Sequence, residues 1–314
     1  MMRTKAYVNG KIVEQDKACI SLLDRGLNYG DGLFETIKAV NGLPLFVSGH
    51  LERLKSGSSA IGLSAASLKP LMADIRSGVM ERLLKSNGLS TGSAYIRVTV
   101  TRGIDAGGHL PAKRAQPTAI IRTRPLDEKT LRRREKKGVS AILIRGFVPA
   151  IPGVKTLNYL PNVIGRSEAS RRKAYEGIFT DSRDHVSEGT SSNLFIVEKA
   201  ILKTPPIKAR GYYCVLPGIT RGCVIELARA NGIKARETII TAERLADCDE
   251  AFLTNSIAGI VPLVSIDGKA LGSGRPGPAT KALQELYNGL IRAEYERRRL
   301  FYQSRGSLIK RKNN

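Results

Sequence analysis

The sequence predicts a two-domain protein with an α+β first half and an α/β second half. Its 314 residues can form two domains of ordinary size, and 42% of them are hydrophobic. The first half carries two Asn-Gly turns between short apolar runs, whereas the second half alternates strand-like and helix-like segments. We expect an N-terminal α+β domain over residues 1–124, a basic connector over 125–138, a C-terminal domain over 139–290 and a basic extension over 291–314.

The first domain is expected to begin with two β-hairpins. Asn9-Gly10 and Asn41-Gly42 each separate apolar runs, and this dipeptide favours a two-residue hairpin turn. The glycine-rich residues 24–32 between the hairpins predict an ordered loop. Apolar spacing after His50 predicts two helices that are broken near Gly62, and alternating residues predict strands over 94–101 and 118–123.

The second domain is expected to contain strands and helices in alternation. Strands are predicted over 139–144, 176–180, 192–197 and 252–254, and helices over 158–171, 219–230 and 278–290. Asn231-Gly232 is a good C-terminal cap for the second of these helices.

The net charge of +23 is concentrated in residues 129–137 and 292–312. Such runs attract nucleic acid or anionic small molecules, or they are simply solvated. Residues 129–137 contain no aromatic residue that could stack a base, and residues 292–312 contain only Tyr295, Phe301 and Tyr302, so we expect no nucleic-acid partner, although basic surface can steer an anionic substrate. An RNA-associated protein that keeps a degenerate enzyme fold is the alternative from a different class.

The cysteines and the hydropathy indicate a reduced, cytoplasmic protein. The four cysteines (Cys19, Cys214, Cys223 and Cys248) form no C-x-x-C pair, so we expect free thiols and no metal site. No apolar run approaches the roughly 18 residues of a membrane span, and residues 1–7 lack the apolar core of a secretion signal.

Lys155 is the first candidate for chemistry. Apolar residues 151–154 precede it, and Leu157, Tyr159 and Leu160 follow, so its amine is expected in a semi-buried position. Burial favours the uncharged, nucleophilic amine. A solvated surface lysine is the alternative on local evidence alone.

Glu188 is the second candidate, in Ser187-Glu188-Gly189-Thr190-Ser191-Ser192 before an apolar strand. A lysine amine together with an acid is what pyridoxal 5′-phosphate requires, because the amine forms a Schiff base and the acid keeps the pyridine nitrogen protonated. The alternative is a turn whose hydroxyls cap the backbone.

A phosphate group needs amides at a helix start, hydroxyls and a guanidinium. Pro217-Gly218 opens a predicted helix whose first residues, Ile219 and Thr220, can supply amides and a hydroxyl. Ser256 follows a predicted strand, and Arg53 lies on a predicted helix. Each of these features alone is also common in purely structural positions.

Several motifs occur together and in a defined order: Asp24–Thr36, His50–Leu54, Thr101–Gly103, the Lys155 segment, Ser187–Phe195, Pro217–Arg221, Thr254–Ser256 and Gly274–Pro278. In this the chain resembles the class IV aminotransferase family, pyridoxal-phosphate enzymes of fold type IV, over about residues 6–290. The resemblance implies the two-domain architecture of D-amino-acid aminotransferases, an active site between the domains and a homodimer.

The resemblance also implies roles for single residues. Lys155 would bind the cofactor covalently and act as acid and base at the substrate, while Glu188 would pair with the pyridine nitrogen and Tyr159 would flank the ring oxygen. The phosphate would be held by Arg53, Ile219, Thr220 and Ser256, and a small amino substrate would be contacted by Tyr29, Phe34, Arg97, Arg102 and Ile257.

Three activities share this scaffold: branched-chain aminotransferase, D-amino-acid aminotransferase, and 4-amino-4-deoxychorismate lyase, which forms pyruvate and 4-aminobenzoate for folate synthesis. Thr36 has the residue type typical of the lyases, where its hydroxyl would relay a proton as a catalytic residue. Tyr95-Ile96-Arg97 is similar to the branched-chain pocket, and Arg102 is similar to an arginine that binds a carboxylate in D-amino-acid enzymes. We expect the lyase, and the two aminotransferases, with 2-oxoglutarate as amino acceptor, remain the alternatives.

Overall fold

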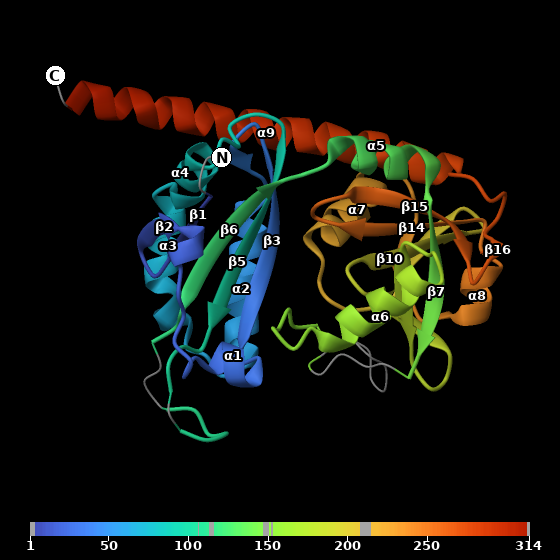
Figure 1. Ribbon diagram of the computed structural model, residues 1–314. Helices are drawn as coiled ribbons and strands as arrows, with labels where there is room; N and C mark the ends of the chain where they lie inside the picture. Colours follow the sequence, from blue (N-terminus) through green and yellow to red (C-terminus); the bar gives the residue numbers. More distant parts are fainter. Residues whose placement is uncertain are drawn as a thin grey trace. The chain divides into compact units, whose positions relative to one another are not determined.

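The protein divides into two compact units, shown by a computed structural model in Figure 1. The structure describes residues 4–105, 107–112, 116–146, 151, 153–207 and 215–312, with side chains up to residue 304; Cys214 lies outside these ranges. Unit 1 comprises Met1–Leu126 and Asn288–Asn314, and unit 2 comprises Asp127–Tyr287.

Unit 1 is built on an antiparallel sheet in the order β2-β1-β6-β5-β3-β4. Its strands are β1 (Lys5–Val8), β2 (Lys11–Glu14), β3 (Gly32–Val40), β4 (Leu43–Pro44), β5 (Ser93–Thr101) and β6 (Ala119–Pro125). Both predicted hairpins are confirmed, because Val8 pairs with Lys11 and Val40 with Leu43. The φ angles are positive at Asn9 (45°) and Gly10 (89°), as the favoured two-residue turn requires.

Helices of unit 1 pack on one face of this sheet. They are α2 (Val47–Ala60), α3 (Lys69–Arg76) and α4 (Val79–Ser86), and α2 packs on β3 while α4 packs on β1. The short helix α1 (Arg25–Tyr29) lies at the end of β5, where a Cβ on Gly26 would meet the Thr101 side chain. The sheet residues beneath them alternate with polar ones, so Ile96 and Val98 are fully buried whereas Tyr95 and Arg97 point to the other face. The break near Gly62 is confirmed by its φ of 67°, but the chain then forms a further helix, α4, that the apolar spacing did not separate from α3.

Unit 2 is built on a mixed sheet in the order β12-β11-β10-β14-β15-β7-β8-β9-β13, with β16 paired to β15. Its strands are β7 (Val139–Arg145), β8 (Glu176–Thr180), β9 (His185–Gly189), β10 (Asn193–Glu198), β11 (Ile201–Thr204), β12 (Ala235–Glu237), β13 (Ile240–Thr241), β14 (Glu250–Asn255), β15 (Gly259–Ile266) and β16 (Lys269–Ala270). Its helices are α5 (Glu128–Lys137), α6 (Leu160–Arg171), α7 (Ile219–Ala230) and α8 (Ala242–Ala246).

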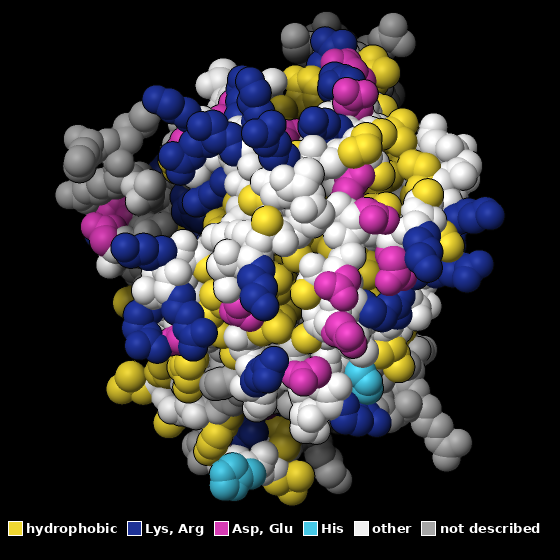
Figure 2. Space-filling model, turned by 90° about the vertical axis from the view of Figure 1, so that its right-hand side faces the viewer, with side chains coloured by type: hydrophobic (Ala, Val, Ile, Leu, Met, Phe, Trp, Pro, Cys, Tyr) yellow, Lys and Arg dark blue, Asp and Glu magenta, His cyan; other side chains and the backbone are white. Residues whose placement is uncertain are grey.

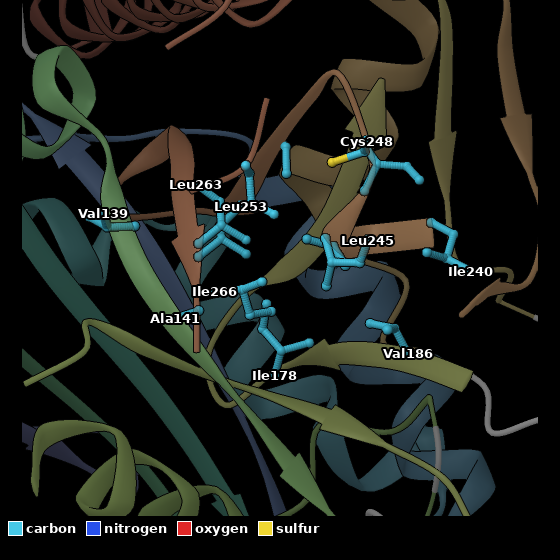
Figure 3. Close-up of a cluster of buried hydrophobic side chains, with 14 of the residues drawn as sticks. Val139, Ala141, Ile178, Val186, Ile240, Leu245, Cys248, Leu253, Leu263 and Ile266 are labelled. Carbon is cyan, nitrogen blue, oxygen red and sulfur yellow. The ribbon is translucent and has the colours of Figure 1, made fainter. Parts of the chain in front are cut away.

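A cluster of buried aliphatic side chains fixes this sheet (Figure 3). Ile178, Val186 and Leu253 are no more than 1% exposed and come from three different strands. Each such side chain stabilises the fold by about 1.5–3 kcal/mol relative to an exposed one. Val186 anchors β9 in this core, and the pairing of β9 with β8 shifts register between Val186 and Gly189, next to Glu188.

The basic stretch at the start of unit 2 is helical. We predict a connector over residues 125–138, and within it Glu128–Lys137 form α5, which is capped by the Asp127 side chain through Thr130 N–H. Gly138, with φ of 77°, follows the helix, and a Cβ there would lie 3.1 Å from the Pro262 carbonyl oxygen. In the view of Figure 2, Lys and Arg side chains gather in the upper left of the surface. In the described part of the chain, no helix combines the length and the apolar character of a membrane span.

The C-terminal extension continues the last helix, α9 (Pro278–Lys312), beyond the expected end near residue 290. Residues 288–304 pack on unit 1. There the buried Glu294 accepts a hydrogen bond from the Phe46 N–H (3.2 Å) at the start of α2, and Arg298 donates to Glu81 (2.9 Å) on α4. The extension is therefore an ordered element of unit 1 up to residue 304.

Candidate active site

Lys155 lies in unit 2 between Gly153 and α6, and its side chain is half-buried as expected. A Cβ placed on Gly153 would be 3.8 Å from the carbonyl oxygen of Val215, so this loop runs beside the segment that leads into α7. The Lys155 Nζ lies 5.7 Å from the ring centroid of Tyr159, the N-cap residue of α6. The Tyr159 hydroxyl donates to the Thr190 carbonyl oxygen (2.8 Å), two residues after Glu188.

Glu188 is held on β9 by two donors. Its Oε2 accepts hydrogen bonds from the Asn193 side chain (3.1 Å) and from the Leu216 N–H (3.0 Å). The Asn193 Nδ2 also donates to the Leu216 carbonyl (2.9 Å). Asn193 thereby ties the carboxylate to the chain just before α7, a contact across 23 residues that the sequence analysis missed.

The N-terminus of α7 has the chemistry of an anion site. Gly218 is its N-cap and supplies no side-chain cap to the first amides, those of Ile219 and Thr220. A Cβ at Gly218 would lie 2.0 Å from the Asn193 Oδ1, so a side chain there would displace the Asn193 amide from its hydrogen bonds. Burial raises the pKa of Tyr287, whose protonated hydroxyl lies 3.2 Å from the Thr220 hydroxyl.

Ser256 and Ile257 lie in the turn after β14, and both are half-buried. The Asn255 side chain shapes this turn, because its Oδ1 accepts hydrogen bonds from the N–H groups of Ile257 (3.0 Å) and Ala258 (2.8 Å). Thr254 pairs with Asn193 across β14 and β10, so the turn begins beside the Asn193 network. Segments carrying the candidates of unit 2 thus lie near the end of β9, the start of β10 and the end of β14.

A second residue missed from the sequence, Glu176, supports the turn that carries Glu188. This carboxylate is 0% exposed and accepts hydrogen bonds from the hydroxyls of Thr190, Ser191 (3.0 Å) and Ser192 (2.9 Å). It also accepts from the Gly177 N–H (3.1 Å). The hydroxyl-rich run after Glu188 is therefore bonded to a buried charge beneath it.

In unit 1, Arg53 belongs to a buried charge cluster. Its Nε and Nη2 donate to the two oxygens of Glu35 (2.8 and 2.6 Å), and His50 Nδ1 lies 2.7 Å from Glu35 Oε2. Burial alone would raise the pKa of Glu35, but hydrogen bonds from Arg53 and His50, together with their charges, lower it to about 2. The guanidinium is thus oriented by an anionic partner.

Replacing Glu35 by glutamine should destabilise the protein by about 3–5 kcal/mol at neutral pH, because it leaves the Arg53 charge buried without its counterion. A lowered pKa contributes stability above the unfolded value of about 4.3, and this contribution is lost as pH falls toward the folded value of about 2. Urea unfolding should therefore show a gap between wild type and E35Q that is large at pH 7 and shrinks below pH 4. Glu52→Gln, at an exposed position of the same helix, is the control. Equal stability of E35Q and E52Q would contradict the cluster.

Arg102 is engaged in the framework of the glycine-rich loop. It is buried, its Nε donates to Asp31 (2.6 Å), and its terminal nitrogens donate to the carbonyl oxygens of Ile61 (2.6 Å) and Gly62 (3.2 Å). Asp31 also accepts from Arg25 Nε (2.9 Å).

Tyr29 is the last residue of α1, the helical turn that this loop contains. Its side chain is 41% exposed, and the Arg25 guanidinium lies 4.7 Å from its ring centroid. The His109 ring is 5.7 Å away. The loop is ordered, as expected, and presents Tyr29 at the surface of unit 1.

Phe34, Thr36 and Arg97 share the sheet face that the helices of unit 1 leave uncovered. Thr36 pairs directly with Arg97 across β3 and β5. The Arg97 guanidinium lies 3.8 Å above the Phe34 ring, and its Nε donates to the Thr99 hydroxyl (3.3 Å). The structure therefore brings these three candidates together.

Comparison with known proteins shows the family. Residues 32–266 match the profile of "Amino-transferase class IV". The chain belongs to the class IV aminotransferase family. It is 36% identical to a putative branched-chain-amino-acid aminotransferase of Methanocaldococcus jannaschii, covering 91% of this chain and 96% of that protein. It is 32% identical to D-alanine aminotransferase of Bacillus licheniformis (92% and 98% covered) and 30% identical to aminodeoxychorismate lyase of Bacillus subtilis (91% and 94% covered).

Solved structures support the same conclusion. The branched-chain amino acid aminotransferase of Escherichia coli has a TM-score of 0.79 at 31% identity, covering 92% of this chain and 94% of that one. A hypothetical aminotransferase of Mycobacterium tuberculosis, in its PLP-bound form, has a TM-score of 0.78 at 25% identity, covering 91% of this chain and 98% of that one. The fold is that of the fold type IV enzymes, and the cofactor of this class IV enzyme is pyridoxal phosphate.

The residues of unit 2 fit this cofactor. The amine of Lys155 lies on the loop beside the segment into α7, the Glu188 carboxylate is tied to that same segment, and α7 begins with amides that no side chain caps. An amine, an acid and an anion-binding helix start are the groups that an aldehyde, a pyridine nitrogen and a phosphate require.

Proposed function

We propose that this protein is a 4-amino-4-deoxychorismate lyase, which cleaves its substrate into pyruvate and 4-aminobenzoate. The observation that carries the proposal is the position of Thr36 on β3. Thr36 pairs with Arg97 of β5 on the sheet face that the helices of unit 1 leave uncovered. The Thr36 hydroxyl, which can transfer a proton, therefore lies beside the Arg97 guanidinium, which can bind the carboxylate on the substrate ring. Elimination of pyruvate needs a proton donor near the departing group, and an aminotransferase has no such requirement.

In unit 2, Lys155 carries the proton chemistry. Pyridoxal phosphate, when bound, accepts the electron pair that is left at the substrate carbon after a proton is removed. We propose that the Lys155 amine removes this proton, that Glu188 pairs with the pyridine nitrogen, and that Tyr159 lies beside the ring oxygen. Hydrogen bonds from Asn193 and Leu216 to Glu188 orient the carboxylate for this task.

The phosphate is proposed to bind the first amides of α7, at Ile219 and Thr220, and the hydroxyls of Thr220 and Ser256. Arg53 is proposed as its guanidinium partner, oriented by Glu35. A charge-assisted hydrogen bond of this kind contributes about 1.5–3 kcal/mol.

Tyr29, Phe34, Arg97 and Ile257 are proposed to contact the substrate. Arg102 is left out of this set, because its three nitrogens already donate to Asp31 and to the carbonyls of Ile61 and Gly62. Arg97 remains for a substrate carboxylate, with Phe34 beneath its guanidinium.

Transamination is the second candidate function. The observation that favours it is the higher identity to the M. jannaschii and B. licheniformis aminotransferases, 36% and 32%, than to the B. subtilis lyase, 30%. The same Lys155 and Glu188 serve this reaction, in which the amino group passes to 2-oxoglutarate.

Product analysis tests the proposal. Purified protein with 4-amino-4-deoxychorismate should release pyruvate and 4-aminobenzoate in equal amounts, and Thr36→Val should lower this rate about 10²–10⁴-fold. Exchange of amino groups between 2-oxoglutarate and L-leucine or D-alanine, without release of 4-aminobenzoate, would establish the aminotransferase in its place.

We also propose a homodimer. Several large apolar side chains of unit 1 are exposed in the loops that carry Tyr29 and His109: Leu22 (82%), Leu27 (56%), Ile104 (60%) and Leu110 (87%). An isolated β-bridge between Asp24 and Ile104 joins these loops. Such a patch is typical of a subunit interface, and sedimentation should give twice the mass of one chain.

A further inference from the structure

Four cationic side chains share the uncovered sheet face of unit 1: Lys38 on β3, Arg97 on β5, and Arg122 and Arg124 on β6. We call this set the basic face. The strand register places them, because Arg97 pairs directly with Arg122, while Tyr95 pairs with Lys38 on one side and with Arg124 on the other. Directly paired residues of antiparallel strands point to the same side, about 4.5–5.5 Å apart at Cβ.

The basic face carries no acidic side chain at the described strand positions. The residues of β3, β5 and β6 that point to this side are the four cations together with Gly32, Phe34, Thr36, Val40, Ser93, Tyr95, Thr99, Thr101 and Ile120. Like charges that face each other across a sheet are destabilising, so the Arg97–Arg122 pair has a cost that a bound anion would remove.

Two of the guanidinium groups lie over aromatic rings. Arg97 is 3.8 Å from the Phe34 centroid, and Arg124 is 4.5 Å from the Tyr95 centroid. Stacking occupies the flat face of a guanidinium and leaves its in-plane N–H donors for an acceptor. Among the described residues, Arg122 and Arg124 have no hydrogen-bond or ion-pair partner, and both are exposed.

We propose that the basic face is a binding site for small dicarboxylates, in which Arg122 adds a second guanidinium to that of Arg97. This inference rests on the proposed function, since it places the site beside Thr36 and assigns it the carboxylate groups of the substrate. One guanidinium suffices for one carboxylate, whereas an opposed pair with two flanking cations favours a ligand with two negative charges. Arg122 is thus a specificity-determining residue.

Thermal unfolding of the holoenzyme with unreactive acids tests the site. Glutarate should raise the melting temperature more than butyrate at equal ionic strength, since a ligand that binds only the folded state stabilises it. Arg122→Gln should weaken glutarate binding about tenfold or more, as the loss of a charge-assisted hydrogen bond does. Arg133→Gln, at an exposed position of α5, removes the same charge elsewhere and should keep the wild-type response.

Without glutarate, Arg122→Gln should leave the melting temperature unchanged or raise it, because the substitution relieves repulsion with Arg97. A residue with a purely structural role would lower it. Equal effects of glutarate and butyrate on the wild type, or a wild-type glutarate response in R122Q, would overturn the proposal. Because glutarate is not turned over, either result is independent of whether pyruvate is released in the lyase assay.

Discussion

Lys155→Ala should lower turnover at least about 10⁴-fold while the protein still folds. The substitution removes both the amine that binds the cofactor and the group that moves the proton, and the two losses combine. Folding should survive because Lys155 lies in a loop outside the helices and strands and its side chain is only half-buried. Initial rates of lyase and aminotransferase reactions would measure the loss.

Borohydride reduction separates this role from a general effect on the fold. The wild type should gain the mass of one reduced cofactor at Lys155, and K155A should gain none. Lys234→Ala, at an exposed lysine of the same unit, is the matched control and should react like the wild type. Covalent cofactor in K155A would assign the bond to another lysine.

Glu188→Gln should lower kcat about 10²–10³-fold with little change in stability. Glutamine keeps an oxygen that can accept from the Leu216 N–H, so the tie to the start of α7 is preserved, but the negative charge is lost. A neutral partner cannot keep the pyridine nitrogen protonated, and the loss of one preorganised electrostatic group has about this effect.

The visible absorption of the bound cofactor gives a second readout for Glu188. Its band should shift in E188Q and stay unchanged in Glu226→Gln, a control on α7 of the same unit. Unchanged kinetics together with an unchanged spectrum in E188Q would remove Glu188 from the site.

Local sequence patterns predicted the fold wherever a short-range rule decides the structure. Asn-Gly turns gave both hairpins of unit 1, and Ile219–Ala230 is helical at the predicted residues, with Gly232 at φ of 74° just beyond its end. Most motif residues of unit 2 lie at strand ends or at a helix start, where β9, β10, β14 and the segment before α7 come together. Alternation also predicted β5 to within one residue.

Long-range contacts decided what the sequence could not show. The strand β9 is short and contains a histidine and a glutamate, so no apolar period marks it, yet it pairs with β8 and β13. Glu176 and Asn193 were read as ordinary strand residues, because their partners lie 14–16 and 23 residues away. The sequence predicts an end of the last helix near residue 290, but α9 continues to Lys312. Beyond residue 290, Glu294 accepts from the Phe46 N–H and Arg298 donates to Glu81, both contacts within unit 1.

The hydrogen bonds of Arg25 and Arg102 to Asp31 affect how the sequences of relatives should be compared at these positions. Arg25 and Arg102 both donate to Asp31, and Arg102 also donates to the carbonyl oxygens of Ile61 and Gly62, so the loss of Arg102 leaves buried acceptors in the loop without their donor. In a mutational library, substitutions at position 102 should therefore lower the stability of the fold, whereas substitutions at position 97 should change the substrate preference. An arginine shared at position 102 by two relatives is evidence of a common loop shape and carries no information on the handedness of the amino acids that they use.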